Sequence, residues 1–192
     1  VKDDNGGPPS KVLLYWRVDG TPTYNQLEMR DDGLMDEGQA NNLKYGASIP
    51  AQANSTIIEF YVEANDGQVT RTWPGPTDES GTQGANCLYR VDNAASGEAP
   101  REIPCYRVIM TASEQAEHNI PRGSNKRFSD AMVSGTFISS FNGDIKVRYL
   151  AGIRYRGSSS RKKNPPSLHI NLPRDDPWEN STRLNLNSDG WY

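Results

Sequence analysis

Five cationic side chains and three consecutive serines lie between residues 154 and 163, after a run with strand-like alternation. Guanidinium groups make two-point hydrogen bonds with phosphate oxygens, and a glycine lets the backbone approach a bound anion closely. This spacing predicts a phosphate site, with the candidates Arg154, Arg156, Gly157, Arg161, Lys162 and Lys163. The alternative is a basic strand-to-strand loop, with Pro165 and Pro166 fixing an extended exit.

A second cluster is acidic and could hold a hard cation. Four carboxylates fall within seven residues, at Asp31, Asp32, Asp36 and Glu37. Calcium binds oxygen ligands of this kind, so Ca²⁺ is the candidate ion. The spacing is not that of an EF-hand loop. The alternative is a solvated acidic loop without a metal.

Two cysteines flank a segment rich in Gly, Ala and Pro. Cys87 and Cys105 each begin a strand-like run on either side of residues 93–104. We predict that they form a disulfide across this linker, which would stabilise the chain by roughly 3 kcal/mol and indicate an oxidising compartment. Two unpaired buried thiols are the alternative. Two isolated cysteines and two histidines do not make a zinc site.

The charge is divided unequally along the chain. Residues 1–100 carry seven Lys and Arg against fifteen Asp and Glu, and residues 101–192 carry fourteen against nine. This asymmetry favours two modules, although solubility alone would also explain it. Nucleic acid is not an expected partner, because the basic residues are not interleaved with stacking aromatics. No apolar run is long enough to span a bilayer.

The first half reads as β structure. Residues 11–18 alternate so that Val12, Leu14, Trp16 and Val18 share one face, and residues 56–66 alternate in the same way. An Asn-Asp-Gly turn at 65–67 then leads into a returning strand at 68–73. Short strands at this spacing predict a sandwich over residues 1–92. We expect its first strand to precede residue 1.

The second half, residues 105–192, predicts an antiparallel meander with one short helical turn. Strand-like runs cover 105–111, 131–140, 144–157 and 167–173, a further strand is expected within 175–192, and residues 112–119 are rich in helix formers. Neither His118 nor His169 stands in a nucleophile–base arrangement, so a hydrolase is not indicated. The fold class expected for the whole chain is mainly β.

Both halves resemble families of secreted bacterial proteins. The run "DDGLMDEG…KYGASIP…IIEFYVEAND" is similar to bacterial extracellular Ig-like modules. The combination "GIRYRGSSSR…NPPSLHINLP…DPW" resembles the start of a CotH domain, the spore-coat kinase-like family. The resemblance implies an Ig-like β-sandwich followed by the mostly antiparallel, N-lobe-like part of an atypical kinase (α+β) fold. It also implies ATP, Mg²⁺ and a secreted or cell-envelope location.

Two departures from the CotH pattern leave the activity open. Better-studied members carry a lysine pair just before the strand, where this chain has Pro165, Pro166 and Ser167. The acids that would hold the metal are expected beyond Tyr192, so we predict that this chain alone is inactive. One hypothesis is a fragment of an atypical protein kinase, whose partners are other segments of its parent chain. The other is a non-catalytic adhesion or matrix protein that binds extracellular proteins.

Overall fold

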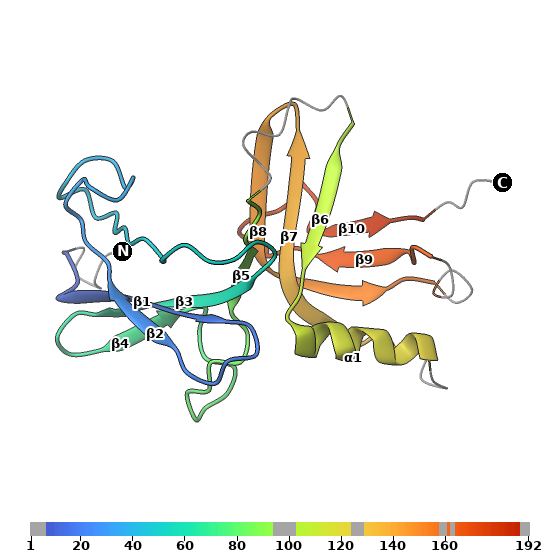
Figure 1. The fold of residues 1–192 in the computed structure, drawn as a ribbon, viewed down its shortest axis with the longest axis horizontal. Helices are drawn as coiled ribbons and strands as arrows, with labels where there is room; N and C mark the ends of the chain where they lie inside the picture. Colours follow the sequence, from blue (N-terminus) through green and yellow to red (C-terminus); the bar gives the residue numbers. More distant parts are fainter. Residues whose placement is uncertain (1–6, 94–102, 124–128, 158–160, 162–163, 189–192) are drawn as a thin grey trace. The chain divides into compact units, whose positions relative to one another are not determined.

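The structure is a computed structural model that describes residues 7–93, 103–123, 129–157, 161 and 164–188 (Figure 1). The chain divides into two compact units, Val1–Asn93 and Ala94–Tyr192. The boundary between the units falls inside the predicted linker, residues 93–104. Ten strands and one helix make up the regular structure of the described residues, which confirms the mainly β class.

The first unit is built on a single antiparallel sheet in the order β2-β1-β3-β4, with β5 also paired to β3. The central strand β3 pairs with three strands: β1 lies along one edge, and the other edge pairs with β5 at Ile57–Phe60 and with β4 at Val62–Asn65. The strands are β1 (Lys11–Val18), β2 (Asn25–Glu28), β3 (Ile57–Asn65), β4 (Thr70–Trp73) and β5 (Cys87–Arg90).

The buried face of this sheet is the one that the sequence predicted. Val12, Leu14 and Trp16 are buried and alternate with the half-buried side chains between them. A sandwich, as predicted from the sequence, consists of two sheets. All the described strands of this unit belong to a single sheet. Alternation shows which face of a strand is buried, but it does not show whether successive strands share a sheet. That pairing depends on the long connections, such as the segment between β2 and β3.

The second unit is a five-stranded antiparallel sheet in the order β10-β9-β8-β7-β6, with a single described helix. Its elements are β6 (Cys105–Ile109), α1 (Ala112–Gly123), β7 (Val133–Phe141), β8 (Asp144–Tyr155), β9 (Leu168–Asn171) and β10 (Arg183–Leu186). The antiparallel meander expected from the sequence is present. An N-lobe-like kinase fold remains a prediction.

The core of the second unit lies on one face of the central strands. Phe137, Ala151, Ile153 and Ile170 are fully buried there. The helix α1 packs against β7 and begins with a capping box, in which the Glu114 backbone N–H donates to the Thr111 hydroxyl at 3.1 Å. None of the described helical segments has the length and apolar character needed to cross a membrane.

A β-bulge decides which side chains of β8 reach this core. The register shifts between Gly135, which lies opposite Ala151, and Phe137, which lies opposite Arg148. Leu150 adopts a positive φ of 57° in the same stretch. Because side chains alternate along a strand, the extra residue transfers Arg148 to the face of Ala151 and Phe137. A charged side chain therefore lies on the core face.

Candidate anion-binding site

Two arginines of the predicted phosphate site converge on one carboxylate. Arg154 lies near the end of β8, and Arg161 lies in the loop that follows. The Asp130 carboxylate, just before β7, accepts hydrogen bonds from Arg154 Nη1 at 2.9 Å and from Arg161 Nη2 at 2.8 Å. Both bonds end on the same oxygen, Oδ1. The two guanidinium groups are thus held side by side by a single anionic oxygen.

Arg161 is the anchored member of the pair. Only 5% of the residue is exposed, and its Nη1 donates to the Ser129 carbonyl at 2.7 Å. Its Nε donates to the carbonyl of Gly157, at the start of the same loop. These contacts tie Gly157 and Arg161 to the segment before β7. They also satisfy most of the donors that a buried guanidinium needs.

The carboxylate itself faces solvent. The Asp130 side chain is 70% exposed, whereas the side chains of Arg154 and Arg161 are 22% and 6% exposed. The three side chains Arg154, Arg161 and Asp130 together carry one net positive charge. A phosphate oxygen accepts the same kind of N–H bond that the Asp130 oxygen accepts here.

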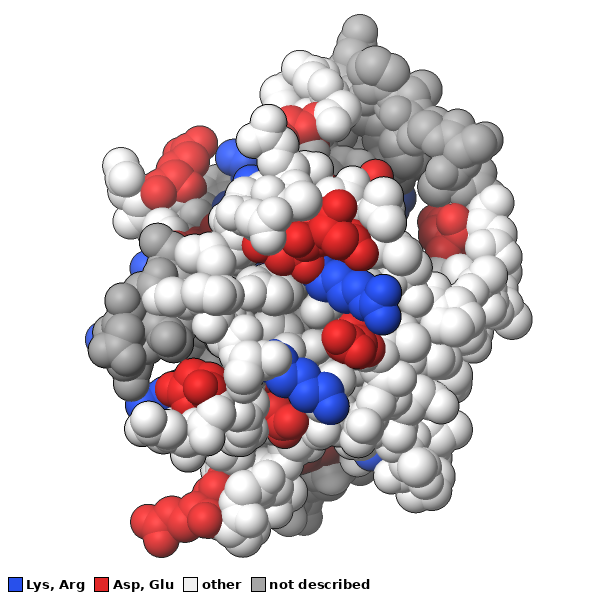
Figure 2. Space-filling view, turned by 90° about the vertical axis from the view of Figure 1, so that its left-hand side faces the viewer, with Lys and Arg blue, Asp and Glu red and all other residues white. Residues whose placement is uncertain are grey.

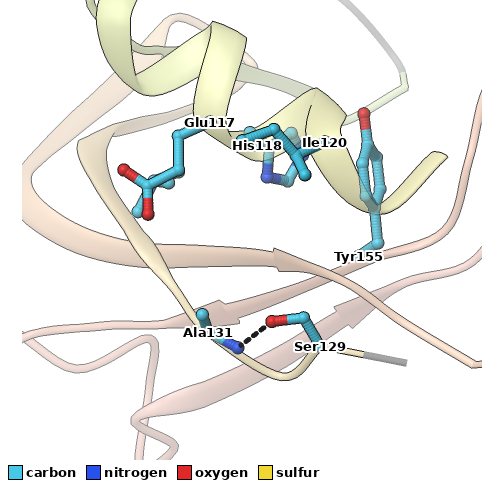
Figure 3. A pocket seen from close by; sticks show the side chains of 7 residues that line it. Glu117, His118, Ile120, Ser129, Ala131 and Tyr155 are labelled. Atoms are coloured by element: carbon cyan, nitrogen blue, oxygen red, sulfur yellow. Dashed lines mark hydrogen bonds between the residues drawn. The ribbon is translucent and has the colours of Figure 1, made fainter. Parts of the chain in front are cut away.

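A pocket of about 180 Å³ adjoins the cluster, between α1 and the sheet (Figure 3). The rings of His118 and Tyr155 lie against one another with centroids 3.9 Å apart, and the Tyr155 hydroxyl donates to Asn119 Oδ1 at 2.7 Å. Figure 3 shows α1 above the pocket and the Ser129 segment below it. The lining residues are Glu117, His118, Ile120, Ser129, Ala131, Val133 and Tyr155.

The structure brings together only part of the set predicted from the sequence. Arg156 does not bond to Asp130 in the described part of the chain, and its Nη1 donates to Asn187 Oδ1, just after β10. Gly157 contributes its carbonyl to Arg161 and has a positive φ of 78°, which glycine tolerates without strain. Lys162 and Lys163 lie outside the described residues. Asp130 was not singled out, although it is the carboxylate that directly precedes a predicted strand.

The acidic cluster of the first unit is used for local hydrogen bonding. The Glu37 carboxylate accepts backbone N–H bonds from four residues, among them Asp32 at 3.0 Å and Met35 at 2.6 Å. The Asp31 carboxylate accepts the N–H groups of Asn42 and Leu43 instead. No three Asp, Glu, His or Cys side chains in the described part of the chain are grouped as metal ligands. The calcium prediction for Asp31, Asp32, Asp36 and Glu37 thus gains no geometric support and stays a prediction.

The two cysteines belong to different units and carry free thiols in the structure. Cys87 is fully buried beside Phe60, its partner on β3. This burial raises the pKa of its thiol to about 12. Cys105 opens β6 and is half-buried. The predicted disulfide is absent from the structure and stays a prediction.

Charged side chains of both signs are mixed over the face drawn in Figure 2, where Lys and Arg lie next to Asp and Glu. Comparison of the chain with protein-family models, curated proteins and solved structures found no match.

Proposed function

We propose that this chain is a segment of a secreted or cell-surface protein of the CotH kind, and that its second unit holds phosphate groups. The observation that supports this function is the convergence of Arg154 and Arg161 on one exposed carboxylate oxygen. Two preformed guanidinium groups around one anionic oxygen are an arrangement suited to a phosphate. The parent protein would then be an atypical protein kinase whose catalytic acids lie outside this chain.

The residues present fit only the phosphate part of ATP. Arg154 and Arg161 would hold phosphate oxygens, and the pocket lined by His118 and Tyr155 lies beside them. When bound, ATP would supply the phosphoryl group for transfer, and Mg²⁺ would neutralise its charge. The described residues offer no grouped carboxylates for that metal. We therefore expect this chain to bind ATP–Mg²⁺ weakly or not at all by itself.

A second function is favoured by the same carboxylate. Because Asp130 already bonds both arginines, the cluster also works as a lock that holds Arg154 and Arg161 to the segment before β7 without any ligand. In that case the chain belongs to a non-catalytic adhesion or matrix protein. The Pro165–Pro166 pair, placed where better-studied family members carry lysines, is consistent with this alternative.

An Asp130→Asn variant separates the two functions. The substitution removes the carboxylate that Arg154 and Arg161 share, so the second unit is destabilised. If the cluster is a phosphate site, tripolyphosphate should bind the variant at least about tenfold more tightly than the wild type and restore its melting temperature. Adding Arg161→Lys should abolish that gain, because lysine lacks the planar guanidinium that bonds the Gly157 and Ser129 carbonyls while it faces the anion. Titration calorimetry and thermal melts measure both quantities.

The control is Asp175→Asn. This residue is also exposed and lies in the same unit, but it lines neither the pocket beside the cluster nor the arginine contacts. It should change neither tripolyphosphate affinity nor stability appreciably. Tripolyphosphate affinity that is equal in the wild type and in Asp130→Asn would contradict the phosphate site. It would leave the structural lock as the function of the cluster.

A further inference from the structure

The β7–β8 hairpin carries a second pocket, separate from the arginine cluster. It measures about 360 Å³, within the usual range for small-molecule sites. One wall comes from the hairpin and the other from the segment around Trp178. The lining residues are Pro104, Ser139, Ser140, Phe141, Asn142, Asp144, Lys146, Arg148, Trp178 and Glu179.

Arg148 is the feature of this pocket that needs an explanation. Its side chain is only 3% exposed, on the core face to which the bulge in the hairpin turns it. Nε donates to the Asp176 carbonyl at 3.1 Å, and Nη2 donates to the Pro177 carbonyl at 3.1 Å. The guanidinium also lies over the Trp178 ring, 5.4 Å from its centroid. A buried cation is costly unless all its donors are used.

Three of the five N–H groups of Arg148 donate hydrogen bonds to described residues, and two do not. Nη1 donates once, in a long bond of 3.5 Å to the Ser139 hydroxyl, and Nη2 donates once, to Pro177. Within the part of the chain that the structure describes, the second N–H of each nitrogen makes no hydrogen bond. The nearest carboxylate oxygen, Asp176 Oδ1, lies 3.4 Å from Nε and is on a half-exposed side chain. A guanidinium with one unused N–H on each terminal nitrogen matches a two-oxygen acceptor.

The rest of the lining narrows the class of ligand. Phe141 is 45% exposed, so it offers apolar surface beside Trp178. The charges of Arg148 and Lys146 are matched by those of Asp144 and Glu179. A monoanion suits this balance better than a phosphate dianion, which would face two carboxylates at close range. An apolar or aromatic body attached to the anion would bury surface against the two rings.

We propose that this pocket binds a small organic carboxylate, with its two oxygens on Arg148 and its apolar body against Phe141 and Trp178. Lys146, a lining residue whose side chain is 61% exposed, adds a second positive charge. The site is independent of the arginine cluster at Asp130. The ligand is either a free aromatic acid or the C-terminal carboxylate of a peptide, because both present the same chemistry.

The test uses phenylacetate as the probe, with the full chain labelled for two-dimensional amide NMR. Phenylacetate should shift the backbone signals of Phe141–Asp144 and the indole signal of Trp178. Phenylacetamide, which lacks the charge, and acetate, which lacks the ring, should each bind at least about tenfold more weakly. The peptide Ala-Ala-Phe with a free C-terminus, compared with its amide, distinguishes a peptide ligand from a free acid.

Substitutions of the lining residues test which side chains contact phenylacetate. Phe141→Ala should weaken phenylacetate binding about tenfold, since it removes one apolar wall. Arg148→Lys, which keeps the charge but loses the planar fork, should weaken it by a similar factor. The matched control is Ile145→Ala, which removes another exposed side chain of the same hairpin, one that does not line the pocket. Equal shifts with phenylacetate and phenylacetamide, or wild-type affinity in Phe141→Ala, would overturn the proposal even if Arg148→Lys fails to fold.

Discussion

Arg17 and Glu59 form a two-point ion pair across directly opposed positions of β1 and β3. Arg17 Nε and Nη2 donate to the two Glu59 oxygens at 3.1 and 2.9 Å. The guanidinium also lies 4.5 Å from the Tyr24 ring centroid, and Asn86 Nδ2 donates to the same carboxylate at 3.1 Å. The Glu59 side chain is only 6% exposed, so this charge relies on its partners rather than on water.

Glu59→Gln should therefore lower the free energy of unfolding of the first unit by about 2 kcal/mol. The glutamine leaves Arg17 without its opposite charge and places a second amide beside Asn86. Urea unfolding followed by fluorescence measures the change. Glu63→Gln is the control on the same strand, because its carboxylate accepts one long bond of 3.3 Å, from the Tyr15 hydroxyl. Equal losses in the two variants would contradict the importance of the two-point pair.

Acid should open the loop that Glu37 holds. The hydrogen bond from its own backbone N–H, together with those from Met35, Gly33 and Asp32, lowers the pKa of Glu37, and partial desolvation opposes this only in part. A carboxyl whose pKa is lowered by folding stabilises the folded state above the usual glutamate pKa of about 4.3. That contribution is lost as the pH falls through the lowered value.

The backbone amide signals of Gly33 and Met35, followed by NMR from pH 7 to pH 2, should report this loss. In the wild type, the chemical shifts of these two signals should change at pH values below the usual glutamate pKa. In the Glu37→Gln variant, the same chemical shifts should be nearly independent of pH. Glu28→Gln, on the exposed strand β2, serves as the control and should leave the wild-type profile in place. A midpoint at or above the ordinary glutamate pKa would refute the assignment.

The two thiols should react at very different rates in the reduced chain. Burial raises the pKa of Cys87 to about 12, so at pH 8 almost none of it is the reactive thiolate. Iodoacetamide should label the half-buried Cys105 first and Cys87 only as the chain unfolds. Intact mass of the unreduced, denatured protein tests the predicted disulfide in the same experiment. Two labels without reductant would exclude the Cys87–Cys105 bond, and no label would establish it.

The strands were predictable from the sequence because their signal is local. Alternation identified the buried face of β1, and the Asn-Asp-Gly signal located the turn at Gly67, whose φ is 96°. The helix α1 runs on to Gly123, past the predicted end at residue 119, although its start matches the prediction. Both packing and capping determine where a helix ends. For α1, only the capping box at the start of the helix can be recognised from the sequence.

The contacts of the candidate sites were not predictable, because they join residues far apart in the chain. Asp130 and Arg161 are 31 residues apart, and they meet only because β7 and β8 pair in one register. Arg148 reaches the core face through a one-residue bulge, and a residue pattern alone assigns it to the opposite face. The sequence places Arg154 and Arg156 on one face of a strand, but β8 ends at Tyr155. Arg154 bonds to Asp130, whereas Arg156 bonds to Asn187.

The two units should separate under brief digestion with an endoproteinase that cleaves after glutamate. The units meet between Asn93 and Ala94, and Glu98 and Glu102 lie just beyond that point in a segment of small and polar residues. Such segments are preferred cleavage sites, whereas glutamates in paired strands, such as Glu59 and Glu63, are protected. The first products should be one fragment ending near residue 100 and one that holds the remainder.

The digestion is run with reductant, because a disulfide between Cys87 and Cys105 would keep the fragments together after cleavage. Changing Glu98 and Glu102 together to glutamine should suppress these products without creating new ones. Each fragment should then resist further cleavage, since each contains a complete sheet with its own buried face. First cuts after Glu59 or Glu63, inside β3, would show that the first unit does not fold independently and that the boundary is wrong.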